Sequence, residues 1–464
     1  MQAPKKPLLS LEQALRLSRH QVRDAYREHM NPGLASLLGL LDSDRQYVRA
    51  EGVYVWDSEG NRYLDFLGGF GSLNLGHNHP RVLEALEKVR TLPNLLQASM
   101  GTMAAALAHN LSALAPGDLK HAFFGNSGAE SVEGALKLAR AATGRTPIVF
   151  CHGSFHGKSL GALSVTGRDK YRKPFMPLLP NCLAVPFGHL PSLEQAFQSA
   201  RPAAFIFEPI QGEGGVVVPP PGYLRGVREL CTRYGVLMIA DEIQTGLGRT
   251  GYLFAVEHEQ VAPDVMCLAK SLGGGIMPIG AFLTTSRIWN QAYGGLDRCL
   301  LHTSTFGGNT WAAAAGIAAL EVLQHENLPQ AAREKGGYML QRLQTLQEKF
   351  PLIKEVRGRG LLIGIEFERP AKGWLDKISA GAVNRLSEEY LGAMVAGELQ
   401  NRYRIITAYT LNNPNVIRLE PPLNVTREQI DQVVDALEDI FSHKGLLGLT
   451  LSTSRTALGS LLKK

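Results

Sequence analysis

The chain has 464 residues, of which 45% are hydrophobic and 19% are charged, and its formal net charge at pH 7 is +6. This length exceeds what a single hydrophobic core usually supports, so we expect at least two domains and an ordered globular protein. The mild basic excess contains no long run of like charges, which argues against nucleic acid as a partner.

The five cysteines are widely spaced and form no CxxC pair, so the sequence predicts neither a disulfide framework nor a metal site. Residues 1–10 contain no apolar signal core, and the longest apolar stretch, at 311–320, is far shorter than a membrane span. We therefore expect a cytoplasmic protein with no membrane segment and no bound metal.

The first predicted element is one amphipathic helix over residues 9–30, ended by the Asn-Pro-Gly sequence at 31–33. A hairpin follows between residues 52 and 66, where two strand-like segments flank the turn sequence Asp-Ser-Glu-Gly at 57–60. We assign residues 1–75 to an N-terminal arm and to part of a small domain.

Short apolar runs occur in the middle of the chain at residues 148–150, 203–207, 236–240 and 265–269. Such runs, separated by helical patterns, are typical of parallel strands covered on both faces. Three of the runs are followed directly by an ionisable residue: Glu208, Asp241 and Lys270. Because the carboxyl ends of strands line the ligand crevice in open α/β sheets, we expect these three side chains to converge. The sequence thus predicts the α/β fold class, with a large domain over residues 76–345 built on a mostly parallel sheet.

A second strand-rich segment of α+β character begins near residue 351. We assign residues 346–446 to a C-terminal small domain, and residues 447–464 to a weakly structured tail.

An anion site is suggested by residues 123–131, where a strand-like pair turns on glycine and a helix begins. Ser127 and Glu130 fit a capping box, and the backbone N–H groups of such a helix start can bind a phosphate. On this motif alone, a capped helix without a ligand is the simpler interpretation.

A cofactor site is suggested by Asp241 and Lys270, which follow two of the buried strands. Lys270 precedes Gly273-Gly274-Gly275, which leaves room for a planar group, and desolvation would lower the lysine pKa and favour imine formation. An aspartate paired with a pyridinium nitrogen keeps that ring protonated, so that it accepts electrons from the substrate carbon. Taken alone, Lys270 is more simply explained as a surface lysine.

Two other motifs are weaker. Residues 246–251 satisfy GxGxxG but do not directly leave a strand, which argues against a dinucleotide site. Residues 152–159 look like the end of a P-loop, yet His152 occupies the position of the first glycine, which argues against ATP binding.

Four motifs occur in order along the chain: Asn126-Ser127-Gly128-Ala129-Glu130, the segment from Glu208 to Gly215, Asp241-Glu242-Ile243-Gln244 with Lys270, and the segment from His302 to Asn309. Together they resemble the class III (ω-) aminotransferases of fold type I, over roughly residues 52–426. The resemblance implies a large domain with a mostly parallel sheet, a smaller α+β domain, and pyridoxal 5′-phosphate as the cofactor.

The resemblance also assigns the residues around the cofactor ring. It implies that Lys270 holds the cofactor as a Schiff base and that Asp241 pairs with the ring nitrogen, these two being the catalytic residues. It implies further that Phe155 stacks on the ring and that Gln244 contacts the ring hydroxyl. Without the family context, Phe155 would be interpreted as a core aromatic.

For the phosphate, the resemblance implies binding by Ser127, Gly128 and Ala129. It implies a homodimer, or a higher homo-oligomer, in which Thr305 reaches the phosphate of the other subunit. Without the family context, Thr305 would be interpreted as a turn hydroxyl.

Within the family, the segments 67–71, 172–180 and 410–413 resemble putrescine aminotransferases most closely. This implies a transaminase that moves the terminal amino group of putrescine, or of cadaverine, to 2-oxoglutarate in a ping-pong reaction. Ornithine and acetylornithine aminotransferases share the cofactor motifs and are the alternative. An aminomutase or racemase, or a non-catalytic relative, is disfavoured further.

The substrate residues implied by the resemblance are Arg418, which would bind a carboxylate, and Glu213, which would pair with it in the absence of a carboxylate. A guanidinium suits bidentate carboxylate binding. A purely structural salt bridge is the alternative. Gln97 aligns loosely with a substrate-side residue of the putrescine enzymes.

Overall fold

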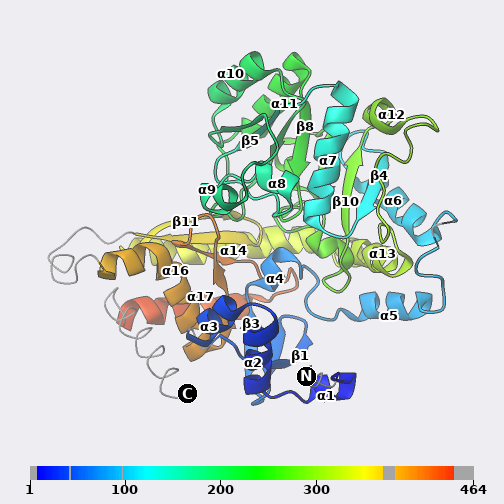
Figure 1. Ribbon diagram of the computed structural model, residues 1–464. Coiled ribbons are helices and arrows are strands. Elements are labelled where there is room, and N and C mark those ends of the chain that lie inside the picture. Colours follow the sequence, from blue (N-terminus) through cyan, green and yellow to red (C-terminus); the bar gives the residue numbers. More distant parts are fainter. Residues whose placement is uncertain (1–7, 41–42, 97, 369–381, 444–464) are drawn as a thin grey trace, which may run out of the picture.

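The computed structural model describes residues 8–40, 43–96, 98–368 and 382–443. The tail at 447–464 and Gln97, both named above, lie outside the described residues. In Figure 1 the green and cyan middle of the chain forms one body, and the blue N-terminal and orange C-terminal segments lie together beneath it.

The upper body is built on a seven-stranded sheet in the order β4-β10-β9-β8-β7-β5-β6. Its strands are β4 (His121–Gly125), β5 (Ile148–Cys151), β6 (Cys182–Val185), β7 (Ala204–Phe207), β8 (Leu237–Asp241), β9 (Val265–Leu268) and β10 (Gly280–Thr284). Strands β5 to β9 pair in parallel, whereas β10 is antiparallel to both neighbours. The four apolar runs therefore form strands, and the predicted mostly parallel sheet is confirmed.

The sheet is buried on both faces because successive side chains of a strand point to opposite sides. Met238 belongs to one hydrophobic cluster and its neighbour Ile239 to the other. One cluster includes side chains of α10 (Leu190–Ala200), α11 (Tyr223–Tyr234) and α13 (Thr310–His325), and the other includes α7 (Gly128–Thr143) and α12 (Ser286–Tyr293). This explains why the strands read as continuous apolar runs.

Two four-stranded sheets form the lower part. The first has the order β1-β2-β3-β13, with β1 (Tyr47–Glu51), β2 (Tyr54–Asp57), β3 (Arg62–Asp65) and β13 (Ile405–Ile406). The second has the order β11-β12-β15-β14, with β11 (Ile353–Arg359), β12 (Leu362–Phe367), β14 (Ala408–Tyr409) and β15 (Val416–Leu419). The antiparallel pairing of β2 and β3 confirms the predicted hairpin, and β13 joins the N-terminal and C-terminal segments in one sheet.

The remaining helices connect or cover these sheets. They are α4 (Gly68–Gly71), α5 (Pro80–Val89), α6 (Thr102–Leu114), α8 (Leu160–Ser164), α9 (Asp169–Arg172), α14 (Leu328–Lys349), α16 (Ala382–Tyr403) and α17 (Arg427–His443), with 3-10 turns at Lys173–Phe175, Ala255–Glu259 and Lys270–Gly273. Among the described residues, no helix is long and apolar enough to cross a membrane, and no cluster of ligating side chains could hold a metal ion.

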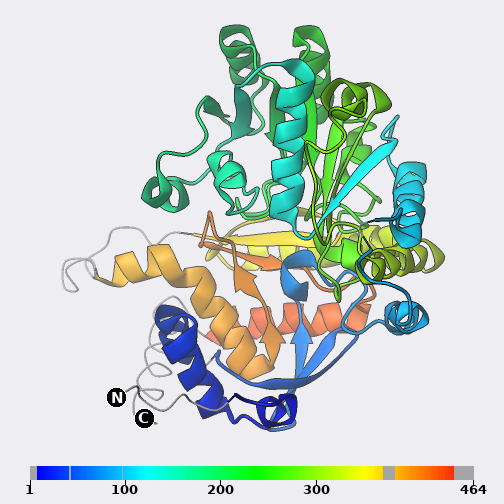
Figure 2. The same cartoon turned by 45° about the vertical axis from the view of Figure 1, so that its right-hand side comes forward.

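The prediction of a single helix over residues 9–30 is wrong. The structure has α1 (Leu11–Leu15) and α2 (Arg19–His29), because Ser18 and Gln21 form a capping box that starts a second helix. The sequence at 31–33 ends α2, but its proline then occupies the first turn of α3 (Pro32–Leu40), a position that proline favours. Figure 2 shows the blue helices beside the orange α16, and Ser43 bonds Gln400 there at 3.2 Å.

Candidate active site

A cavity of about 680 Å³ lies where β7, β8 and β9 end. Glu208, Asp241 and Lys270 all line it, as do Phe155 and Gln244. The structure therefore brings together the three ionisable residues that follow the predicted strands. It adds the start of α7, with Ser127, Gly128 and Ala129 in the same wall.

Lys270 follows β9 and has left-handed backbone geometry, with φ of 47°. This conformation is uncommon for a residue with a side chain and marks a position fixed by its surroundings. Burial lowers the pKa of the Lys270 ammonium, and the carboxylates of Glu420 and Glu213 offset part of that effect. The amine thus loses its proton more readily than an exposed lysine does, as a nucleophile requires.

Asp241, the last residue of β8, is held by a buried histidine. The Nδ1 atom of His156 donates to its Oδ2 atom at 2.6 Å, and the Ile243 N–H donates to Oδ1 at 3.1 Å. The other ring nitrogen of His156, Nε2, is buried without a hydrogen-bond partner among the described residues. The sequence predicts a role for Phe155, but it does not predict the contact that the next residue, His156, makes with Asp241.

Glu208 joins two loops at the cavity wall. Its carboxylate accepts from the Phe155 N–H at 3.0 Å and from the Gly212 N–H at 3.1 Å. Burial raises the pKa of Glu208 to about 7, so that it carries a proton for much of the time near neutrality. The contacts fix the backbone of Phe155 relative to the loop that carries Glu213.

The start of α7 partly matches the predicted capping box. Ser127 accepts from the Glu130 N–H at 3.2 Å, as expected. The Glu130 carboxylate, however, accepts from the N–H of Asn126 instead of that of Ser127. A Cβ added at Gly128 would lie 2.9 Å from the Ile243 side chain, so the absence of a side chain there lets the two segments pack closely.

Gln244 lies between the cavity and the N-terminal segment. Its Nε2 atom donates to the Phe70 carbonyl at 3.2 Å and lies 3.4 Å from Oε2 of Glu420. Phe70 belongs to a run of left-handed residues that includes the three glycines of α4. This run of left-handed residues positions Phe70 at the cavity. In the sequence, only the resemblance of residues 67–71 to putrescine aminotransferases indicated this segment.

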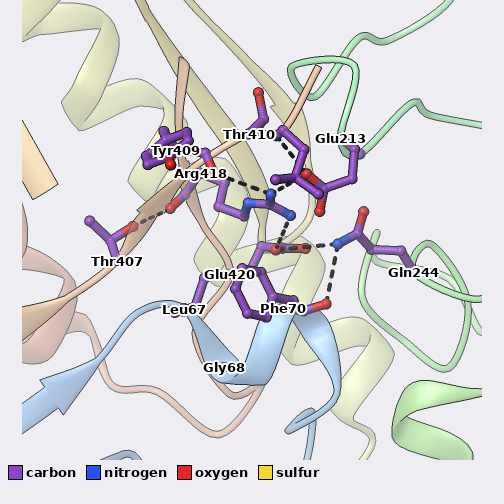
Figure 3. Close-up of polar contacts among 12 residues, drawn as sticks. Leu67, Gly68, Phe70, Glu213, Gln244, Thr407, Tyr409, Thr410, Arg418 and Glu420 are labelled. Atoms are coloured by element: carbon purple, nitrogen blue, oxygen red, sulfur yellow. Dashed lines mark hydrogen bonds and ion pairs between the residues drawn. The ribbon is translucent and has the colours of Figure 1, made fainter. Parts of the chain in front are cut away.

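Arg418, on β15, is buried and contacts two carboxylates (Figure 3). Its Nη2 atom lies 2.5 Å from Oε2 of Glu213, and its Nη1 atom lies 3.5 Å from Oε2 of Glu420. The guanidinium also lies over the Phe70 ring, 5.3 Å from its centroid. Burial by itself would raise the pKa of Glu213, but the charge and hydrogen bond of Arg418, together with the Leu411 N–H and the charge of Lys270, lower it, so Glu213 is ionised.

The hairpin loop between β14 and β15, residues 410–415, covers the same region. Its Leu411 N–H donates to Oε2 of Glu213 at 2.7 Å, the same oxygen that Arg418 contacts. The Asn412 side chain donates to the carbonyls of Gly153 at 2.8 Å and Ser154 at 3.1 Å. The loop therefore ties the lower sheets to both loops that carry cavity residues.

Two sequence-predicted residues do not join this cluster. Thr305 is exposed and lines a separate hollow of about 450 Å³, where Asn126 donates to Ser304 at 3.2 Å. Gln97 lies outside the described residues. The GxGxxG segment at 246–251 does not line the cavity either, and its Arg249 is buried and donates to the Leu361 carbonyl at 3.0 Å.

Comparison with known proteins agrees with these observations. The profile of the family "Aminotransferase class-III" matches residues 42–441. The structure of ornithine aminotransferase from Toxoplasma gondii ME49 is 32% identical, with a TM-score of 0.81, over 93% of this chain and 97% of that one. Acetylornithine aminotransferase from Elizabethkingia anophelis is 31% identical, with a TM-score of 0.75, over 92% and 100%. An amine transaminase from an uncultivated Pseudomonas species, in its PLP-bound form, is 31% identical, with a TM-score of 0.77, over 86% and 95%.

Proposed function

Since the chain belongs to the class III aminotransferases, we propose that it moves the terminal amino group of a diamine, putrescine or cadaverine, to 2-oxoglutarate. The products would be an amino aldehyde and glutamate. The single observation that carries this proposal is the buried contact of Arg418 with Glu213, because one site must accept an ammonium in one half-reaction and a carboxylate in the other. The free state of all five cysteines fits the cytoplasm, which we propose as its location.

Pyridoxal 5′-phosphate is the cofactor of this family, and two observations on the described residues fit it. The N-terminus of α7 opens into the cavity with the first backbone N–H groups of a long helix, which suits a phosphate. Asp241 and Lys270 line the same cavity, which suits a protonated pyridine ring that bears an aldehyde. When bound, the cofactor supplies a carbonyl that condenses with amines and a ring that withdraws electrons from the reacting carbon.

Each residue of the chain then has a defined task. Lys270 would hold the cofactor through its Nζ atom, and the same atom would carry the proton between the two carbons that exchange it. Asp241, fixed by the Nδ1 hydrogen bond of His156, would keep the ring nitrogen protonated. Phe155 and Gln244 would hold the ring and its hydroxyl, and Ser127, Gly128 and Ala129 would bind the phosphate.

The end of the substrate that lies far from the reacting group would be recognised by its charge. Glu213 would accept the distant ammonium of a diamine, and Arg418 would bind the distant carboxylate of 2-oxoglutarate. An ornithine or acetylornithine aminotransferase is the second candidate, because structures of similar proteins carry those names. A non-catalytic relative is set aside, since Lys270 and Asp241 are both in place in the cavity, and an aminomutase is the less favoured alternative.

Half-reactions followed by absorbance separate these candidates. The loaded protein is mixed with putrescine, cadaverine, ornithine or acetylornithine, and the fall of the visible band is measured. Recovery of the band on adding 2-oxoglutarate, with release of an aldehyde, supports a transaminase. The diamine proposal is overturned if ornithine or acetylornithine reacts with higher efficiency than both diamines.

Arg418→Lys should impair the keto-acid half-reaction selectively. A lysine keeps the buried positive charge beside Glu213 and Glu420 but loses the planar fork that binds a carboxylate through two bonds. We expect efficiency with 2-oxoglutarate to fall about ten- to a hundredfold, while that with putrescine changes by less than about threefold. Stopped-flow absorbance measures both, and Arg342→Lys, at a surface ion pair of α14, is the control. Equal losses in both half-reactions would mean that Arg418 is structural.

A homodimer is proposed from the surface around Thr305. Several apolar side chains near it are exposed: Leu95, Leu96, Met100, Leu300, Leu301 and Phe306. The segment that carries Leu95, Leu96 and Met100 lies beside the segment that carries Leu300, Leu301 and Phe306. A hydrogen bond joins them, in which the Thr310 N–H donates to the Asn94 carbonyl at 3.2 Å. Exposed apolar side chains gathered in one patch often mark a protein–protein interface, and a second copy of the chain would cover them.

Sedimentation equilibrium should accordingly give twice the chain mass of 50.5 kDa. Thr305→Ala should leave the dimer intact but weaken retention of the cofactor about tenfold, as loss of one hydrogen bond to a charged phosphate predicts. Cofactor retention is measured by equilibrium dialysis. Ser304→Ala is the matched control, since Ser304 bonds Asn126 within the chain. A monomer, or identical retention in both variants, contradicts this prediction.

A further inference from the structure

Glu420 is a buried carboxylate whose role the proposed mechanism does not yet use. It follows β15 two residues after Arg418, and residues so spaced on a strand share one face. Its side chain is fully buried, its Oε2 atom lies near Arg418 and Gln244, and its Oε1 atom has no hydrogen-bond partner among the described residues (Figure 3).

The backbone of Glu420 is fixed, so its carboxylate stays beside the guanidinium. The Glu420 N–H donates to the Phe66 carbonyl at 2.8 Å. Gly68 packs against the Glu420 carbonyl so closely that an added Cβ would lie 2.3 Å away, and a Cβ at Gly71 would lie 3.1 Å from Oε1. The α4 segment therefore packs closely against both the backbone carbonyl and the carboxylate of Glu420.

Glu213 differs from Glu420 in its access to the cavity. Glu213 lines the cavity, whereas Glu420 does not and instead lies near Gln244, which does. Glu213 is thus the carboxylate that can meet a substrate. Glu420 is the carboxylate that remains with Arg418 whatever the substrate is.

Charge balance gives this arrangement a consequence. A buried guanidinium that loses its partner becomes an uncompensated charge. The free energy cost of such a charge strongly disfavours the loss of the partner. A substrate ammonium that binds Glu213 competes with Arg418 for the same carboxylate, so an Arg418 with Glu213 as its sole partner would lose part of its neutralisation. Glu420 supplies a second negative charge to the same guanidinium, so Glu213 can be released.

We propose that Glu420 is a specificity-determining residue for amine donors that carry a second ammonium group, and that it acts by keeping Arg418 neutralised while Glu213 binds that ammonium. The inference rests on the proposed diamine function. It assigns to a residue outside the cavity the choice between a donor with a second charge and a donor without one.

The test compares Glu420→Gln with the unaltered protein on two donors of equal length, putrescine and n-pentylamine, which has a methyl group in place of the second ammonium. We expect the amine half-reaction with putrescine to lose about ten- to a hundredfold in efficiency, and that with n-pentylamine to change by less than about threefold. Binding of glutarate, an unreactive dicarboxylate, is measured by calorimetry. It should become equal or tighter, because Arg418 has one competitor fewer.

Two controls give the result its meaning. Glu366→Gln removes a carboxylate from another arginine pair on the neighbouring strand β12, with Arg357 at 2.6 Å, and should leave the ratio of the two donors unchanged. In an Arg418→Gln background, adding Glu420→Gln should have no further effect on the ratio, because Glu420 acts through Arg418. If Glu420→Gln alone fails to fold, a change of the ratio in the Arg418→Gln background still overturns the inference.

The outcomes are distinct. If the unaltered protein does not react with diamines, the proposed function fails and the inference fails with it. If it does react, but Glu420→Gln loses equally on both donors or binds glutarate more weakly, the inference alone is overturned and Glu420 is structural. A further loss of discrimination in the Arg418→Gln background also overturns it, since Glu420 would then act directly on the substrate.

Discussion

The Lys270→Ala protein is expected to fold normally and to lose all covalent attachment of the cofactor. The side chain lines the cavity, and its strand β9 is held by buried neighbours on both faces, so removing the amine should not disturb the sheet. Because the same Nζ atom carries the transferred proton, turnover should fall by at least about 10²- to 10⁴-fold. Borohydride reduction followed by mass spectrometry of peptides measures the attachment.

Lys335→Ala is the matched control for this experiment. Lys335 is a partly buried lysine on α14 that donates to the Leu423 carbonyl at 3.2 Å, outside the cavity. Reduction should fix the cofactor to the Lys335→Ala protein as it does to the unaltered one. Fixation of the cofactor to another lysine in the Lys270→Ala protein would remove Lys270 from its proposed role.

The Asp241→Asn protein is expected to keep its cofactor and to lose most of its turnover. Asparagine has nearly the same shape and its oxygen can still accept from His156, so the fold and the cavity should persist. A neutral amide cannot keep the ring nitrogen protonated as negative charge develops. The chemical step should therefore slow by about 10²- to 10³-fold, with single-turnover absorbance as the measurement.

Asp264→Asn controls for the loss of a partly buried aspartate from the same sheet. Asp264 precedes β9 at the opposite end from the cavity and pairs with Arg228 at 2.9 Å. That variant should lose stability without a change in single-turnover rate. Unchanged single-turnover rates in Asp241→Asn with both substrates would contradict the pairing with the ring nitrogen.

The central sheet could be predicted from the sequence because its signal is local. A strand covered on both faces needs apolar side chains at every position, and each such run is visible in a few residues. The ends of the strands are equally visible, which is why Glu208, Asp241 and Lys270 could be expected at one site. The mostly parallel sheet follows from the same local pattern combined with the rule for open α/β folds.

Contacts between distant segments could not be predicted in this way. His156 and Asp241 lie 85 positions apart in the chain, and no periodicity links them. The contact of Glu420 with Arg418 could not be predicted for a different reason: the spacing of two residues is visible in the sequence, but the burial of the two side chains is not. The break between α1 and α2 could have been predicted, since Ser18 and Gln21, which form the capping box of α2, are both visible in the sequence.

The shared oxygen of Glu213 has a consequence for engineering the amine scope of this protein. Oε2 of Glu213 holds both the Arg418 guanidinium and the Leu411 N–H, and the next residue, Asn412, fastens the loop to Gly153 and Ser154. A mutant library that randomises position 213 alone would release a loop as well as a charge. Positions 213, 411 and 412 are therefore better varied together, as one cassette, with loop anchoring scored separately from donor preference.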